Sequence, residues 1–324
     1  MNSQSKKILS IGIKVAVLGL AFWFIFQKLS NNQNIDNFVS LLYKLSLSDV
    51  YIVMSSIVLL MFLNWFIEAL KWKYLVRGLE KISTWKAVES VFCGLTWAVF
   101  TPNRIGEFGG RVFFLSPRKR IMGVIAMSVG AIGKLVVTNV LGSLALFCFI
   151  LRFANLNPFV NFGLGLLILL YCSLFILFYF NIQWLYGLLK KVNFLRRWKR
   201  FLIIFSRYKY ADMVRILIYS LSRYLIFTIQ YFLIIHFLVP EIKTFDMVMI
   251  LFVFYFIQSS LPSLDMLDIG VRASVATYFF AFVTTQEIAI MAAIAAIWMI
   301  NLIIPAIFGS IFVLKLNFFG HSTN

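Results

Sequence analysis

Two polar motifs with the same order of residue types interrupt an otherwise apolar chain, at residues 101–111 and 261–272. In each motif a proline precedes an acid and an arginine follows four residues after the acid: Pro102, Glu107 and Arg111 in the first, and Pro262, Asp268 and Arg272 in the second. Residues four apart lie on one face of a helix. An arginine beside a helix N-terminus suits an anion such as a lipid phosphate. Alternatively, each pair neutralises itself and locks the chain, or the two acids do catalysis.

Both motifs contain residues that end or bend helices. Proline lacks a backbone N–H and stops the preceding helix, and glycine lets the chain turn or another helix approach closely. Backbone groups freed in this way cannot face lipid, so they must be buried in protein or line a wet cavity. We therefore expect each motif to close a helical hairpin through Pro102, Gly106, Gly109, Gly110, Pro262 and Gly270.

The composition places both motifs inside a membrane protein. Hydrophobic residues make up 62% of the chain and charged residues 13%, whereas soluble domains have about 45–50% and about 25%. This composition excludes a water-soluble enzyme, a secreted disulfide scaffold and a disordered tail. The three cysteines lie far apart in apolar runs, and the two histidines show no metal-binding spacing. We expect no disulfide, no metal and no cofactor.

Hydropathy and charge together predict the topology. We expect six full spans near residues 9–28, 47–70, 121–151, 159–182, 216–239 and 287–314. Most of the 30 basic residues fall in segments 71–86, 118–120 and 190–215, which the positive-inside rule assigns to the cytoplasm. Basic groups flank residues 84–117 at both ends, so this segment must enter and leave on the cytoplasmic side. By the same logic, residues 246–286 enter and leave on the opposite side.

These predictions define the fold class as an all-α polytopic membrane protein with about six full transmembrane helices and two re-entrant hairpins in an inverted repeat. The order span, span, hairpin, span occurs twice, in halves at roughly 1–152 and 159–315. Each half crosses the membrane an odd number of times, so the halves are inverted and both termini are cytoplasmic. Broken helices in matching positions indicate a transport site near the midplane. We expect residues 1–324 to form one multi-pass domain in the inner (plasma) membrane.

Further ionisable residues are expected near this site, because charges inside a membrane are costly and are usually functional. Glu68 ends the second span, where we expect it either to pair locally with Lys71 or to contribute to the wall of a cavity. Lys134 and Arg223 lie inside later spans. We expect Lys134 to face the interior of the bundle and to pair with Glu107 or Glu68. The predicted substrate-binding set is Glu68, Asn103, Arg104, Glu107, Arg111, Lys134, Arg223, Asp268 and Arg272.

Segment 183–215 alternates aromatic and basic residues. Nucleic-acid binders show similar patterns, but membrane spans flank this segment on both sides. We expect it to lie on the cytoplasmic leaflet as an amphipathic helix held by anionic lipids, with no nucleic-acid partner. A solvated loop without a partner is the alternative.

The chain resembles the lysylphosphatidylglycerol synthase transmembrane-region (flippase-like) family over nearly its whole length. The similar stretches are Asn64-Trp65…Glu68-Ala69…Lys71-Trp72, Pro102…Gly106-Glu107…Arg111 and Pro262…Gly270-Val271-Arg272. Many members carry a glycine-rich run before an acid in the last stretch, and this chain does not. The family includes the flippase half of the multiple peptide resistance factor. The resemblance implies movement of an anionic, aminoacylated or polyprenyl-phosphate lipid between leaflets, and we expect no aminoacyl-transferase domain.

We therefore predict a lipid translocase that is not an enzyme, has no catalytic residues and takes a membrane lipid with a phosphate headgroup as its substrate. One alternative is a membrane-embedded transferase or hydrolase acting on a lipid, with Glu107 and Asp268 as its acid and base. The sequence lacks a metal cluster, an Asp-rich diphosphate motif and a Ser–His arrangement that would support it. The other alternative is a non-catalytic membrane partner of a synthase or glycosyltransferase.

Overall fold

The computed structural model describes residues 39, 40, 43, 45–99, 101, 104–184, 187, 203–261 and 268–314. The regular structure of these residues is helical, and they contain no β-strand. Five of the helical segments in this part of the chain are long and apolar enough to cross a bilayer. The chain is therefore an all-α polytopic membrane protein, as the sequence predicts.

The long helices match five of the six predicted spans. They are α3 (Leu47–Val76), α6 (Arg120–Phe153), α7 (Pro158–Phe180), α11 (Tyr210–Leu238) and a last span made of α14 (Glu287–Trp298), a π-helical turn (Met299–Ile303) and α15 (Ile304–Leu314). A short 3-10 turn (Pro117–Lys119) leads into α6. The predicted span at 9–28 lies outside the described residues. Residues 210–215, expected on the membrane surface, instead begin α11, and α10 (Ile204–Arg207) precedes them.

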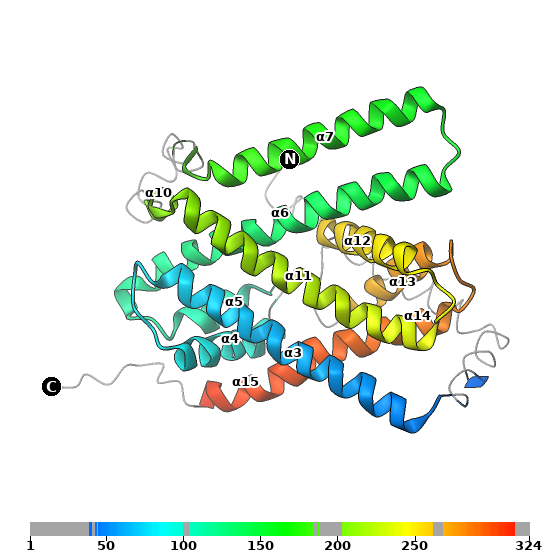
Figure 1. The fold of residues 1–324 in the computed structure, drawn as a ribbon. Helices are drawn as coiled ribbons and strands as arrows, with labels where there is room; N and C mark the ends of the chain where they lie inside the picture. The colour runs from blue at the N-terminus through cyan, green and yellow to red at the C-terminus, as the bar shows by residue number, and fades with distance from the viewer. Residues whose placement is uncertain are drawn as a thin grey trace, which may run out of the picture.

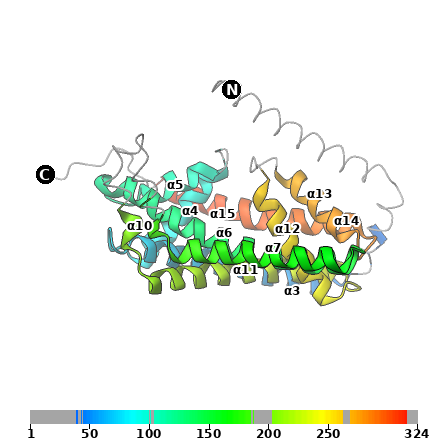
Figure 2. The same ribbon diagram turned by 90° about the horizontal axis from the view of Figure 1, so that it is seen from above.

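Two pairs of shorter helices form the predicted hairpins. α4 (Thr84–Val99) packs against α5 (Ile105–Val112), and α12 (Thr244–Ser260) packs against α13 (Asp268–Phe280). Figures 1 and 2 show the two pairs toward opposite ends of the long helices. The α4–α5 hairpin lies at the end where α3 stops and α6 begins, and the α12–α13 hairpin lies at the other end (Figure 1).

The glycines of the first hairpin differ in their surroundings. A Cβ atom added to Gly110 would lie 2.6 Å from the Cα atom of Gly94, and one added to Gly106 would overlap the carbonyl oxygen of Trp97. These two glycines therefore let α4 and α5 run antiparallel with their backbones in contact. A Cβ atom added to Gly109 would meet no atom within 4 Å, so no other described helix approaches closely at Gly109.

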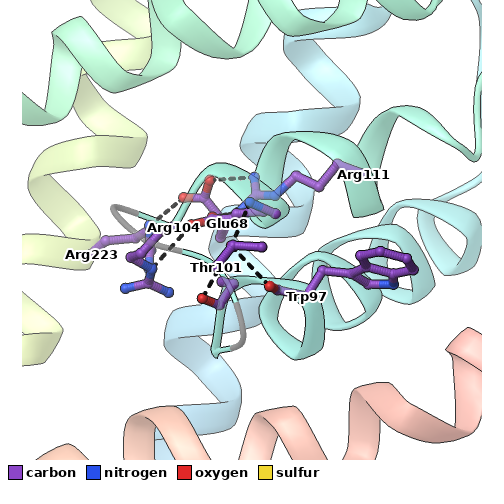
Figure 3. A network of polar contacts seen from close by, with 9 residues as sticks. Glu68, Trp97, Thr101, Arg104, Arg111 and Arg223 are labelled. Carbon is purple, nitrogen blue, oxygen red and sulfur yellow. Dashed lines mark hydrogen bonds and ion pairs between the residues drawn. The ribbon is translucent and has the colours of Figure 1, made fainter. Parts of the chain in front are cut away.

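The chain leaves the hairpin tip at Arg104, whose backbone is left-handed with a φ of 57°. This conformation costs a residue with a Cβ atom about 1–2 kcal/mol. The Gly106 N–H donates to the Thr101 Oγ1 atom at 2.7 Å, and the Thr101 hydroxyl donates to the Trp97 carbonyl oxygen at 3.0 Å (Figure 3). These bonds satisfy backbone groups that the break between α4 and α5 leaves unpaired, and they hold the tip in place.

Each hairpin packs against the last span of the other half. α4 lies against α15, and α12 lies against α6. Gly309 on α15 contacts the carbonyl group of Phe92 in α4, and Gly142 on α6 approaches the carbonyl oxygen of Phe252 in α12. The two contacts occupy equivalent places. Gly142 and Gly309 lie the same number of residues after the start of their spans, at 120 and 287. Phe92 and Phe252 likewise lie the same number of residues after the start of α4, at 84, and of α12, at 244.

A carboxylate clamps the segment after α3 to the end of the first hairpin. The Glu80 Oε2 atom accepts hydrogen bonds from the Ser116 hydroxyl at 2.7 Å and the Ser116 N–H at 3.0 Å, and Lys86 and Lys119 lie 3.7 Å from its two oxygens. Burial opposes ionisation of Glu80, but these hydrogen bonds and cations outweigh burial and lower its pKa. The ionised carboxylate therefore stabilises the loop between α3 and α4.

The glycine contact predicts a difference between two neighbouring substitutions. Gly110→Ala should lower the free energy of unfolding by about 1–3 kcal/mol, because its methyl group meets backbone that cannot move aside. Gly109→Ala should leave stability unchanged or raise it by about 0.5–1 kcal/mol, because alanine favours the helix and has room. Thermal unfolding of the purified protein in detergent measures both. Equal losses in the two variants would contradict the assigned contact.

The Glu80 clamp predicts a pH dependence. Because its pKa is lower in the folded state, its contribution is present above the unfolded pKa of about 4.3 and is lost as pH falls through the folded value. Glu80→Gln should therefore cost stability at neutral pH, by about 1 kcal/mol or less for this partly exposed group. The gap from the wild type should close below about pH 4. A gap that stays constant from neutral to acid pH would show that the charge of Glu80 does not act here.

Candidate functional site

The site is built around the carboxylate of Glu68, which α3 buries in the centre of the bundle. Its Oε1 atom accepts a hydrogen bond from Arg111 Nη1 at 2.7 Å, and its Oε2 atom pairs with Lys71 Nζ at 2.8 Å and with Arg223 Nη1. Figure 3 shows the two arginines reaching Glu68 from different helices. Of the two roles expected for Glu68, the local pair with Lys71 is present, and Glu68 also lines a cavity. Arg111 on α5 and Arg223 on α11 also pair with Glu68 in the structure.

A second carboxylate, that of Glu107, belongs to the same cluster. It pairs with Arg111 Nη2, as the spacing of four residues predicts, and lies 3.4 Å from Arg104 Nε. Arg111 is 1% exposed and therefore bridges the two carboxylates in the interior. Breaking one partner of a buried ion pair is much more costly than breaking an exposed one. The cluster thus ties the first hairpin to α3 and α11.

Two adjoining cavities surround this cluster. The larger has a volume of about 320 Å³ and the smaller about 160 Å³. They share the lining residues Trp65, Lys71, Arg104, Lys134 and Arg223. The smaller cavity is also lined by Glu68, Glu107 and Arg111, and the larger reaches the second hairpin at Gln258 and Arg272. Described site residues of the two halves therefore line two cavities that share part of their walls.

Among the described residues that line these cavities, positive charge exceeds negative charge. Among the described residues that line them, the only carboxylates are Glu68 and Glu107. The cations are Lys71, Arg104, Arg111, Lys134, Arg223 and Arg272. Such an excess in a low-dielectric interior repels itself and attracts an anion.

Lys134 faces the cavities and makes no direct ion pair with a described residue. Its side chain is exposed, and it forms no hydrogen bond or ion pair with any residue that the structure describes. As the sequence predicts, it faces the interior of the bundle. Glu107 is near enough to attract it, but no direct ion pair forms with Glu107 or Glu68. Arg111, Arg104, Lys71 and Arg223 already surround those two carboxylates.

The second hairpin contributes an amide and a guanidinium. With the Gln258 amide oriented so that its oxygen faces the guanidinium, that oxygen accepts from Arg272 Nε and Nη2, both at 2.8 Å. Gly270 is buried in α13 next to this pair. The sequence predicted Asp268 as the partner of Arg272. The predicted positions whose side chains lie outside the described structure are Pro102, Asn103, Pro262 and Asp268.

Sequence reasoning missed several polar lining residues that the fold brings to the cavity. Asn64 accepts from Arg223 Nε at 2.8 Å, and Asn301 lies on the π-helical turn of the last span. Tyr224 and Gln258 line the same space. The sequence feature that could have identified Asn64 and Asn301 is that each places a polar amide inside an apolar span.

The arrangement is suited to binding an anion. Guanidinium and ammonium groups recognise phosphate by charge-assisted hydrogen bonds. Arg223 also lies over the ring of Trp65, 4.9 Å from its centroid, which fixes its plane. The described residues contain no group of three or more side chains able to hold a metal ion.

The central carboxylate predicts a large effect of one substitution. Glu68→Gln should lower the free energy of unfolding by about 3–5 kcal/mol, because it removes the charge shared by the buried Lys71 and Arg111 and the half-buried Arg223. Glu89→Gln is the control, since Glu89 lies on α4 and has no ion pair among the described residues. Thermal unfolding in detergent measures both variants. A Glu68→Gln protein as stable as the control would contradict the role of Glu68 as the centre of the cluster.

Comparison with known proteins identifies the family of this chain. The family model for the lysylphosphatidylglycerol synthase TM region matches residues 11–309, which include both hairpins and the cluster around Glu68. The searches of curated proteins and of solved structures found no match. The chain belongs to the lysylphosphatidylglycerol synthase TM-region family of membrane, lipid-related proteins.

Proposed function

We propose that the protein is a lipid translocase that moves a lipid with a phosphate headgroup between the leaflets of the cell inner membrane. The observation that carries this proposal is the excess of cations around a cavity inside a bundle of membrane-spanning helices. A charge inside the bilayer is costly, so a cavity of this kind needs a ligand of opposite charge. A headgroup phosphate provides it while the acyl chains stay in the bilayer.

The packing of the two hairpins supports an inverted repeat. Each hairpin contacts the last span of the other half through a glycine in an equivalent position, Gly142 or Gly309. We propose that both hairpins are re-entrant and enter from opposite faces of the membrane, in agreement with their places at opposite ends of the long helices (Figure 1). Inverted repeats around a midplane site allow one half to rock against the other and expose the site alternately.

The distribution of charge supports an orientation. The ends of α3, α6 and α11 near the first hairpin carry Arg77, Lys119 and Lys209 among other basic residues. The positive-inside rule assigns this end, and with it both termini, to the cytoplasm. The cavity would then open to either leaflet through the hairpin that lies on that side.

The ion pairs of Glu68 and Glu107 support transport rather than covalent chemistry. Glu68 and Glu107 are each paired with at least two cations, so neither is placed to act as a general base. We therefore propose that the protein binds and moves its lipid without changing it. Mass spectra of the lipids recovered from the transport assay below test this point, because an enzyme would return a modified headgroup.

A leaflet assay on reconstituted protein tests the translocase. Liposomes that hold the purified full chain and fluorescent phosphatidylglycerol are treated with a membrane-impermeant quencher, and the inner-leaflet lipid that becomes accessible is followed. Lys134→Gln should slow this exposure about tenfold, because a charge-assisted hydrogen bond is worth about 1.5–3 kcal/mol. Lys81→Gln, which changes an exposed lysine outside the cavities, should keep the wild-type rate.

The outcomes of this assay separate the proposals. Protein-dependent exposure that Lys134→Gln slows and Lys81→Gln does not slow supports translocation through the cavity. Equal rates in both variants and the wild type would place the path elsewhere. Rates no higher than in protein-free liposomes for phosphatidylglycerol and for a polyprenyl phosphate would contradict translocation. The non-catalytic partner of a synthase or glycosyltransferase would then be the better hypothesis, and co-purification would test it.

A further inference from the structure

The two hairpins are exchanged between the halves of the chain. α4 of the first hairpin packs against α15 of the second half, and α12 of the second hairpin packs against α6 of the first half (Figure 1). We call the first hairpin together with the last span, α14 to α15, the first exchanged unit. The second exchanged unit is the second hairpin together with α6. α3 and α11, which pack against each other, are the central pair.

Both units are packed backbone to backbone at equivalent positions. A Cβ atom added to Gly309 on α15 would overlap the Phe92 carbonyl oxygen and the Thr96 hydroxyl of α4. One added to Gly142 on α6 would overlap the Cβ atom of Phe256 on α12. Thr96 and Phe256 lie the same number of residues after the start of α4, at 84, and of α12, at 244. Because helices in lipid associate through such close contacts, each hairpin is firmly held on the other half.

A polar contact also holds each unit together. In the first unit, the Thr96 hydroxyl donates to the Ala306 carbonyl oxygen of α15 at 2.8 Å. In the second unit, Arg152 of α6 lies with its Nε atom 2.9 Å from Oδ1 of the buried Asp246 on α12, and its Nη2 atom donates to Oδ2 at 2.9 Å. A bidentate pair of this kind is among the stronger polar contacts in proteins. Each hairpin is therefore bonded to the last span of the other half as well as packed against it.

The larger cavity lies between the two units. The first unit lines it with Arg104, Trp298 and Asn301, and the second unit lines it with Thr138 and Gln258. The central pair also contributes to its wall. The units contact each other mainly where the chain passes from one to the other, between α5 and α6 and between α13 and α14. A displacement of one unit against the other would therefore change the width of the cavity.

The helices of the central pair are joined by hydrogen bonds between residues far apart in the chain. Gln230 Nε2 on α11 donates to the Ile57 carbonyl oxygen on α3 at 2.9 Å. Arg223 Nε on α11 donates to Asn64 Oδ1 on α3 at 2.8 Å. The central pair is thus a third body, against which both units can move.

The first unit contacts the central pair through an ion pair that an anion can replace. Arg111 Nη1 donates to Glu68 Oε1 at 2.7 Å, and both residues line the smaller cavity. A phosphate oxygen accepts from a guanidinium as a carboxylate oxygen does. Glu68 keeps Lys71 and Arg223 as partners when Arg111 turns to another acceptor. A bound phosphate can therefore loosen the first unit from the central pair without leaving Glu68 unpaired.

We propose that translocation moves the two exchanged units against each other about the central pair, so that each hairpin travels with the last span of the other half. The bodies that move are then these units rather than the two sequence halves. Segments 113–119 and 281–286, which join the units, act as hinges. A phosphate that binds Arg111 favours the displaced arrangement, because it binds that arrangement more tightly. This proposal rests on the proposed function, since it describes how the same cavity opens.

Two cross-links that share α15 test which helices move together. The rings of Trp85 on α4 and Phe312 on α15 lie 6.2 Å apart, and those of Phe62 on α3 and Phe308 on α15 lie 5.7 Å apart. Trp85→Cys with Phe312→Cys links helices within the first unit, and Phe62→Cys with Phe308→Cys links this unit to the central pair. Both pairs are built on a chain whose three native cysteines are replaced by alanine. A short bifunctional methanethiosulfonate joins each pair, and a reductant releases it.

The leaflet assay compares each variant before and after cross-linking, with fluorescent phosphatidylglycerol and with its lysyl derivative. The cross-link within the first unit should leave the rate unchanged. The cross-link to α3 should slow the rate at least about tenfold, because it blocks the conformational step, and reductant should restore it. If the sequence halves moved as rigid bodies, the α4–α15 cross-link would join them and stop transport. Slowing by that cross-link, or an unchanged rate with the other, would overturn the proposal.

The rate of cross-linking in detergent gives a second measurement that needs no transport. Added phosphatidylglycerol should change the rate for the cysteines at 62 and 308 at least about threefold, because the bound phosphate shifts the first unit against α3. It should leave the rate for the cysteines at 85 and 312 unchanged. This result without movement of any lipid in liposomes would support the exchanged units and contradict the translocase. Equal effects on the two pairs, or an effect on neither, would overturn the exchanged units.

Discussion

The sharing of the buried Glu68 carboxylate and the half-buried Glu107 carboxylate among a larger number of cations is the constraint on which the rest of this structure depends. Glu68 alone draws together Lys71 from its own helix, Arg111 from the first hairpin and Arg223 from α11. An unpaired carboxylate or guanidinium inside a membrane costs much free energy, so these side chains pair with one another. The cluster therefore fixes where three separate elements meet. It also leaves a net positive charge that the described residues do not balance.

The backbone makes this meeting possible. Arg111 reaches Glu68 only because α5 packs closely on α4, and that packing needs hydrogen in place of a side chain at Gly110 and Gly94. The left-handed backbone at Arg104 completes the tip and lines both cavities with a cation. Glycine contacts of the same kind seat each hairpin on the last span of the other half. Close backbone packing is thus used in preference to apolar burial, which offers little between helices that lie in lipid.

The two cavities join the chemistry of the halves without making them alike. The first half supplies most of the cations and both described carboxylates, and the second supplies Arg223 and Arg272 with amides and aromatic rings. The π-helical turn at Met299–Ile303 is the local irregularity that brings Asn301 to the wall of the larger cavity.

The sequence alone determined the all-α membrane fold, the positions of five described spans and the two hairpins, because hydropathy, proline and glycine act through the local chain. It also determined the Glu107–Arg111 and Glu68–Lys71 pairs, since helical spacing places those side chains on one face. The tertiary structure decided that Arg223 meets Glu68, 155 residues away, that Arg272 meets Gln258 and that Lys134 meets neither predicted acid. These contacts depend on the rotation and separation of packed helices. A periodicity of 3.6 residues specifies the face of one helix, but it does not specify which other helix that face meets.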